Sequence, residues 1–163
     1  MKAVIGVLLL LCVFCNDSVS TSERPHARES FVVDSPQNQG TCTYTLTMRT
    51  SCLSSSSTRD QISLTFGDAY GNQVYIPRLD NPNQRTFTRC ATDTFQLTGP
   101  CTYQICYVYI YRRGTDGLRL KRATIQGYNM RPVTFEYHAN IPSGVWFGFN
   151  HCQSGGYKRA TYS

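Results

Sequence analysis

Cysteine is the residue type with the clearest chemical role in this sequence. Two of the eight cysteines, Cys12 and Cys15, lie in an apolar N-terminal segment, and the other six follow it. An even set of cysteines in an oxidising compartment is typical of disulfides. A zinc site is disfavoured because the spacing of these six matches no zinc pattern and includes no Cys-x-x-Cys pair. The sequence predicts three disulfides, with the pairing open, among Cys42, Cys52, Cys90, Cys101, Cys106 and Cys152.

A second group of residues is basic. Between Arg112 and Arg122 the chain carries five positive side chains and one acid, Asp116, around the apolar Leu118. We expect a hairpin with Leu118 at its tip, which could bind an anionic lipid surface at about 1 kcal/mol per basic residue. A protein partner or acidic cell-wall polysaccharide fits as well, whereas secretion argues against nucleic acid. The same charges are equally compatible with a solvated sheet edge that prevents aggregation between molecules. The predicted contact residues are Arg112, Arg113, Leu118, Arg119, Lys121 and Arg122.

Metal binding and catalysis depend on a few polar residues. Calcium is bound by hard oxygens that converge from loops, and Asp60 and Asp116 occupy such positions. Isolated aspartates at turns are also common turn formers, so calcium is one of two open interpretations, and no other cofactor is expected. The sequence has no GxSxG, no HExxH and no glycine-rich phosphate loop. We therefore expect no enzymatic activity.

The elements that must position these residues are predicted to be strands. Residues 41–50 alternate between threonine or arginine and a more apolar set, as in a half-buried strand. Segments rich in β-branched and aromatic residues follow at 60–68, 73–77, 93–97, 102–112, 122–128 and 132–142, separated by turn residues. Within 102–112 both faces are apolar or aromatic, which predicts a central strand or, alternatively, an exposed row of tyrosines. Seven or eight short strands predict an all-β sandwich.

The N-terminus predicts entry into the secretory pathway. Lys2, an apolar run to Cys15 and the small residues Ser18 and Ser20 are the parts of a cleavable signal peptide, residues 1–20. We expect a flexible N-terminal arm over 21–40, one folded domain over 41–152 and a C-terminal tail over 153–163. The length of 163 residues permits one domain, and no apolar run is long enough for a transmembrane segment. The expected location is extracellular.

Four stretches carry a family resemblance. They read TRDQISLTFGDAYGNQVYIPRLD, RTFTRCATDTFQLTGPC, YQICYVYIYRRGTDG and PVTFEYHANIP…VWFGFNHC. In order, spacing and cysteine placement they make residues 41–152 similar to the plant embryo-specific protein three-like group, small secreted proteins with a PLAT domain. The resemblance implies a sandwich of two four-stranded antiparallel sheets. It also implies a non-catalytic role in embryo or seed development or stress response, with loop aromatics and sometimes calcium at lipid contacts.

One residue departs from this family pattern. Many members have tryptophan after the Asp-Gly turn, where this chain has Leu118, and leucine anchors a membrane interface less well than tryptophan does. Our main hypothesis is a secreted, non-catalytic PLAT-like module that binds a lipid surface or a protein partner. The alternative is an extracellular-matrix or polysaccharide-binding protein, in which tyrosines stack on sugars. A hydrolase is the third hypothesis.

Overall fold

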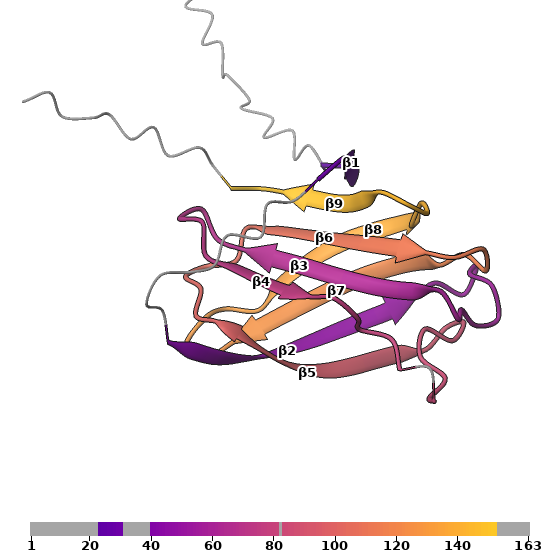
Figure 1. Ribbon diagram of the computed structural model, residues 1–163, viewed down its shortest axis with the longest axis horizontal. Helices are drawn as coiled ribbons and strands as arrows, with labels where there is room; N and C mark the ends of the chain where they lie inside the picture. The colour runs from indigo at the N-terminus through magenta and orange to yellow at the C-terminus, as the bar shows by residue number, and fades with distance from the viewer. Residues whose placement is uncertain (1–22, 31–39, 82, 153–163) are drawn as a thin grey trace, which may run out of the picture.

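The computed structural model describes residues 23–30, 40–81 and 83–152. The predicted signal peptide and C-terminal tail lie outside these residues. The described part contains no α-helix and therefore no helix that is long and apolar enough to cross a membrane. Its strands, shown in Figure 1, are β1 (His26–Arg28), β2 (Thr41–Thr50), β3 (Gln61–Gly67), β4 (Gln73–Ile76), β5 (Thr92–Pro100), β6 (Tyr107–Arg113), β7 (Arg119–Gly127), β8 (Val133–Asn140) and β9 (Trp146–Asn150).

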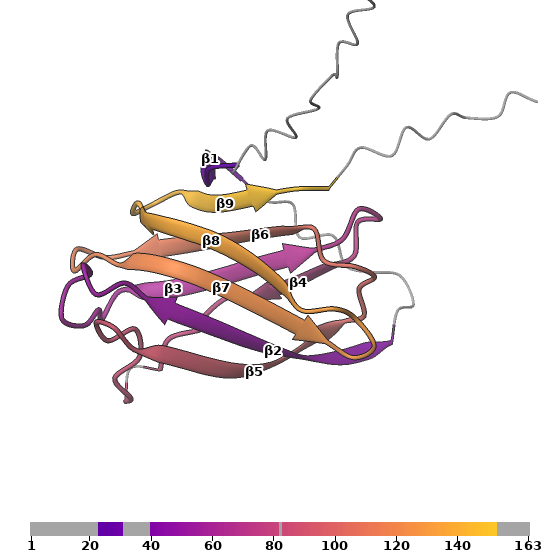
Figure 2. The same ribbon diagram turned by 180° about the vertical axis from the view of Figure 1, so that it is seen from behind.

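The strands form two antiparallel sheets that pack face to face, as Figures 1 and 2 show from opposite sides. One sheet has the order β1-β9-β6-β3-β4 and the other β5-β2-β7-β8. The predicted all-β sandwich is confirmed. The expected two four-stranded sheets differ in one respect, since residues 26–28 of the predicted flexible arm pair with β9 as a fifth strand. These three residues have no apolar pattern that would predict a strand. They form one because they pair with the edge of β9.

Alternation along β2 explains the burial of one face of the four-stranded sheet. Tyr44, Leu46 and Met48 are almost completely buried, whereas the two threonines between them lie on the outer face and are half-buried. Strand β7 lies beside β2 and adds Ala123 and Ile125 to the same core. The alternation of apolar and polar side chains along β2 therefore determines which face of this sheet packs against the core.

The aromatic strand β6 is central, as the first of the two interpretations predicted. It lies between β9 and β3, and its Val108 and Ile110 are fully buried in the core. Tyr107, Tyr109 and Tyr111 alternate onto the other face, where ring contacts and the N-terminal strand cover them in part. Burial, followed by the charge of Asp68, raises the pKa of Tyr107 to about 12. This tyrosine row is not an exposed stacking surface.

All six predicted cysteines form disulfides, and the structure resolves their pairing. The bridges are Cys42–Cys101, Cys52–Cys90 and Cys106–Cys152. Two of them lie at one end of the sandwich, where β2 begins and β5 and β9 finish, and the third lies at the opposite end. Each bridge closes a long loop in the unfolded chain and typically adds about 2–4 kcal/mol of stability. Three disulfides are typical of a protein in an oxidising compartment.

Candidate functional site

The basic residues between 112 and 122 do not form the predicted hairpin. Strand β6 belongs to the five-stranded sheet and β7 to the four-stranded sheet, so residues 114–118 cross from one sheet to the other. The prediction was wrong because a turn signal such as Asp116-Gly117 looks the same in the sequence whether the flanking strands pair with each other or belong to different sheets.

Two of the predicted contact residues are buried. Leu118 has an exposed fraction of 3% and packs in the core, and Arg112 has one of 8%. Leu118 was predicted to be the apolar tip of a hairpin, but the crossing between the sheets turns it inward. Among the other four, Arg113 and Arg122 are exposed, and Arg119 and Lys121 are half-buried. The cluster therefore offers scattered charges rather than one surface.

Asp60 and Arg112 form a buried ion pair that holds this crossing. Nη1 of Arg112 donates to Oδ2 of Asp60, and Nε of Arg112 donates to the carbonyl of Ile141 at 2.8 Å. The amides of Asp116 and Gly117 donate to the two oxygens of Asp60, each at 3.1 Å. Burial raises the pKa of Asp60, but the amides and the guanidinium together outweigh it, so the pKa lies below its usual range.

Both aspartates considered for calcium already have partners within the protein. The guanidinium of Arg112 already occupies the cation position at the carboxylate of Asp60. Asp116 uses Oδ2 to accept the amide of Arg59 at 2.8 Å. Within the described ranges there is no group of three or more His, Cys, Asp or Glu side chains placed to hold a metal. Asp60 and Asp116 therefore act on the protein's own loops.

Three exposed tyrosines gather at the opposite end of the sandwich, which we call the tyrosine end: Tyr70, Tyr103 and Tyr128. Their exposed fractions are 70%, 65% and 80%, and they lie on the loops that follow β3, β5 and β7 (Figure 1). The rings of Tyr70 and Tyr103 are in edge contact with centroids 5.1 Å apart. Tyr103 and Tyr128 line a shared hollow of about 410 Å³ together with Arg131. The three side chains thus form one neighbouring set.

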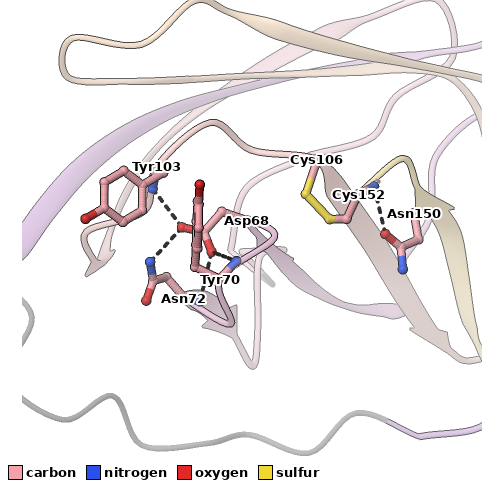
Figure 3. The surroundings of a disulfide bond; sticks show 7 residues. All are labelled: Asp68, Tyr70, Asn72, Tyr103, Cys106, Asn150 and Cys152. Atoms are coloured by element: carbon pink, nitrogen blue, oxygen red, sulfur yellow. Dashed lines mark hydrogen bonds between the residues drawn. A yellow bond between two sulfur atoms is a disulfide. The ribbon is translucent and has the colours of Figure 1, made fainter. Parts of the chain in front are cut away.

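A buried carboxylate, Asp68, orders two of these loops. Its Oδ1 accepts the amides of Tyr70 at 2.8 Å and Asn72 at 3.0 Å. Its Oδ2 accepts the amide of Tyr103 at 2.8 Å and the side-chain amide of Asn72 at 2.7 Å. Figure 3 shows these groups converging on Asp68. One carboxylate therefore joins the β3–β4 loop to the β5–β6 loop.

Disulfides hold the same end of the molecule. The amide of Cys106 donates to the carbonyl of Gly67 at 2.9 Å, and its disulfide joins Cys152, which follows β9 (Figure 3). Cys101 is bridged to Cys42 at the start of β2. Tyr103 therefore projects from a loop with a disulfide at each end, and Asp68 ties the loop of Tyr70 to it by hydrogen bonds. This fixing of the two loops lowers the entropy lost when the tyrosines bind a surface.

Comparison with known proteins assigns the family. A model of the family described as "Embryo-specific protein 3, (ATS3)" matches residues 31–152. The chain belongs to the embryo-specific protein 3 family. Embryo-specific protein ATS3B of Arabidopsis thaliana is 54% identical over 131 residues, covering 80% of this chain and 69% of the relative. Embryo-specific protein ATS3A of the same plant is 41% identical over 155 residues, covering 91% and 87%.

Solved structures with a similar fold come from much larger proteins. A lipoxygenase variant superposes with a TM-score of 0.58 at 16% identity, covering 67% of this chain and 17% of the lipoxygenase. Coral 8R-lipoxygenase superposes with a TM-score of 0.54 at 16% identity, covering 65% and 17%. The chain therefore spans about a sixth of the length of these enzymes. The likeness shows a PLAT-like fold, as the family resemblance implied.

The tyrosine end was not identified from the sequence. Tyr70 lies in the stretch GDAYGN and Tyr128 in GYNMRP, so each stands among turn residues, and Tyr103 lies in a segment predicted as strand although β6 begins only at Tyr107. An aromatic residue in a predicted turn indicates an exposed aromatic side chain, because turns between strands are rarely buried. Recognising that the three turns meet at one end requires the strand order.

Proposed function

We propose that this protein is a secreted, non-catalytic binding module that attaches to lipid surfaces through its tyrosine end. The observation that carries this proposal is the gathering of Tyr70, Tyr103 and Tyr128, all exposed, on three loops at one end of the sandwich. Tyrosine has an apolar ring and a polar hydroxyl, so it suits the boundary between lipid and water. The chain's net charge of +6 favours anionic membranes.

The environment of the histidines supports a non-catalytic role. Nε2 of His26 is 2.7 Å from the hydroxyl of Tyr109, Nε2 of His138 is 3.0 Å from Glu136, and Nε2 of His151 is 3.2 Å from Glu23. In the described part of the chain, none of these histidines has a hydrogen bond to a serine, threonine or free cysteine that a base would activate. The relatives, too, are named as embryo-specific proteins and not as enzymes.

The physiological setting is part of the proposal. The family name supports a role in the plant embryo, and the three disulfides support an extracellular location. The structure of coral 8R-lipoxygenase is described with calcium activation via a C2-like domain. For this chain we propose attachment that needs no calcium, because Arg112 already occupies the cation position at Asp60.

Co-sedimentation with vesicles tests the proposal. The mature, oxidised protein is mixed with phosphatidylcholine vesicles, with and without phosphatidylserine, in calcium or in chelator. We expect binding to anionic vesicles in both conditions and at least tenfold weaker binding for the variant Y70S/Y103S/Y128S. A loss of about 0.5 kcal/mol per ring is sufficient, because 1.4 kcal/mol corresponds to a factor of ten.

A matched control lies at the other end of the sandwich. Leu53 is as exposed as Tyr128, at 80%, and Leu53→Ser removes apolar surface without touching the tyrosine end. We expect Leu53→Ser to bind vesicles like the unaltered protein. If the triple variant, still disulfide-bonded and folded, sediments as well as the unaltered protein, the tyrosine end is not the attachment surface. If the unaltered protein binds no vesicle, lipid attachment itself is refuted.

A further inference from the structure

A polar cavity lies at the end of the sandwich opposite the tyrosines. It has a volume of about 640 Å³ and is lined by the loop before β3 and the loop between β4 and β5. Every side chain that the structure describes in its wall is polar: five hydroxyl groups, three amides, one carboxylate and two guanidinium groups, those of Arg59 and Arg85. We call this cavity the Arg59–Arg85 pocket. Its composition is unlike the tyrosine end, so it requires a different kind of ligand.

The two loops that form this pocket are fastened to each other. The disulfide Cys52–Cys90 joins them covalently. The amide of Arg89 donates to the carbonyl of Ser56 at 3.1 Å, and its Nε donates to the carbonyl of Ser54 at 2.9 Å. These contacts hold the walls in place before any ligand arrives, which is the property expected of a preformed site.

The charge inside the pocket is positive because its carboxylate is already paired. Oδ2 of Asp80 accepts Nε and Nη2 of Arg78 at 3.1 and 3.0 Å, and Oδ1 accepts the amide of Ile62 at 2.8 Å. Arg59 and Arg85 are exposed and, among the residues that the structure describes, form no ion pair. Two guanidinium groups therefore remain to receive an anionic ligand.

We propose that the Arg59–Arg85 pocket binds acidic polysaccharide built from uronic acid units. Guanidinium groups bind carboxylates with paired, charge-assisted hydrogen bonds, and the hydroxyl and amide side chains match the hydroxyl groups of the sugar rings. A neutral glycan would leave both charges unpaired. An apolar ligand would leave the polar wall without partners, at a cost in affinity.

A membrane ligand fits this pocket less well than a polysaccharide does. Among the described residues that line it, the pocket has no apolar side chain that could enter a bilayer. The pocket loops precede β3 and β5, whereas the loops of Tyr70 and Tyr103 follow the same two strands, so the pocket and the tyrosines face in opposite directions. The inference stands independently of lipid attachment, since it rests on a different set of residues.

Binding to polygalacturonate tests the inference, with two variants of equal charge. R59Q/R85Q removes both pocket cations, and R113Q/R122Q removes two exposed arginines outside the pocket wall, so each variant lowers the net charge by the same amount. We expect at least tenfold weaker binding for R59Q/R85Q and a change below about twofold for R113Q/R122Q. Methyl-esterified pectin, whose carboxyl groups are neutral, is expected to bind at least tenfold more weakly than polygalacturonate.

Several results would overturn the proposal. Equal weakening by the two double variants would mean that the basic protein attracts any polyanion without a site. Equal binding to the methyl ester would remove the role of the carboxylate. A loss of vesicle binding by R59Q/R85Q, with polygalacturonate binding intact, would assign the pocket to lipid phosphate. Y70S/Y103S/Y128S should keep its polygalacturonate binding, so the two proposals can fail separately. Thermal unfolding midpoints of both double variants check that they remain folded.

Discussion

The substitution Asp68→Asn tests whether one buried carboxylate organises the tyrosine end. Asp68 accepts four hydrogen bonds and is 3% exposed. Asparagine keeps one oxygen, enough for the amides of Tyr70 and Asn72, and places an NH₂ group where Oδ2 was. The side-chain amide of Asn72 can rotate to accept from this group, but the amide of Tyr103 loses its acceptor. A hydrogen bond to a charged group is worth about 1.5–3 kcal/mol, so we expect a loss of about 2–3 kcal/mol.

Asp93→Asn is the matched control for this prediction. Asp93 accepts one amide, that of Phe87 at 3.0 Å, and burial raises its pKa. One oxygen of an asparagine can replace that contact, so we expect a loss below about 1 kcal/mol.

Urea unfolding of the oxidised proteins measures the loss of unfolding free energy in each variant, from the shift of the midpoint at an unchanged dependence on urea concentration. Vesicle binding should fall for Asp68→Asn alone. A loss below about 0.5 kcal/mol for Asp68→Asn, or equal losses for the two variants, would refute the role given to Asp68.

Two further predictions concern residues that the sequence placed at a surface or a metal site. Leu118→Ala should lower the free energy of unfolding by about 2–5 kcal/mol, as for other buried leucines, and leave vesicle binding of the folded protein unchanged; reduced vesicle binding without destabilisation would restore Leu118 as a contact. Asp60→Asn leaves Arg112 buried without its partner and should cost about 3–5 kcal/mol at neutral pH. Because folding lowers the pKa of Asp60, its stabilisation is present above about pH 4 and is lost as pH falls through the lower folded value. Urea midpoints from pH 2 to 7 should therefore fall less steeply for Asp60→Asn, and parallel pH profiles would contradict this assignment.

Local patterns in this sequence predicted seven of the nine strands in the described residues, all except β1 and β9. Contacts between distant strands explain the cysteine pairing and strand β1, which these patterns missed. Residues 41–50 alternate strictly, and the structure has β2 over the same span. The cysteine pairing could not follow from spacing, because Cys42 meets Cys101 only where β2 lies beside β5. Strand β1 is a similar case, since its three residues become a strand through the edge of β9.

The candidate sites were harder to predict than the fold, for a related reason. Counting charges along the chain selected residues 112–122. The structure divides these residues between two sheets and pairs Arg112 with the buried carboxylate of Asp60. The cations of the Arg59–Arg85 pocket are 26 positions apart in the sequence, so no local window contains them. A site made where loops meet depends on strand order, which composition and periodicity do not encode.

The two proposed sites have a geometric relation that follows from the strands between them. Strand β3 runs for seven residues from the pocket loop to the loop of Tyr70, which separates the two ends by about 20 Å at about 3.3 Å per residue. Disulfides hold the loops at both ends to the same sandwich. A molecule attached to lipid by its tyrosines would therefore direct Arg59 and Arg85 away from the bilayer, toward whatever acidic polymer lies outside it. Because neither ligand reaches the other site, saturating polygalacturonate should leave vesicle binding in place, whereas mutual displacement would mean that both ligands use one surface.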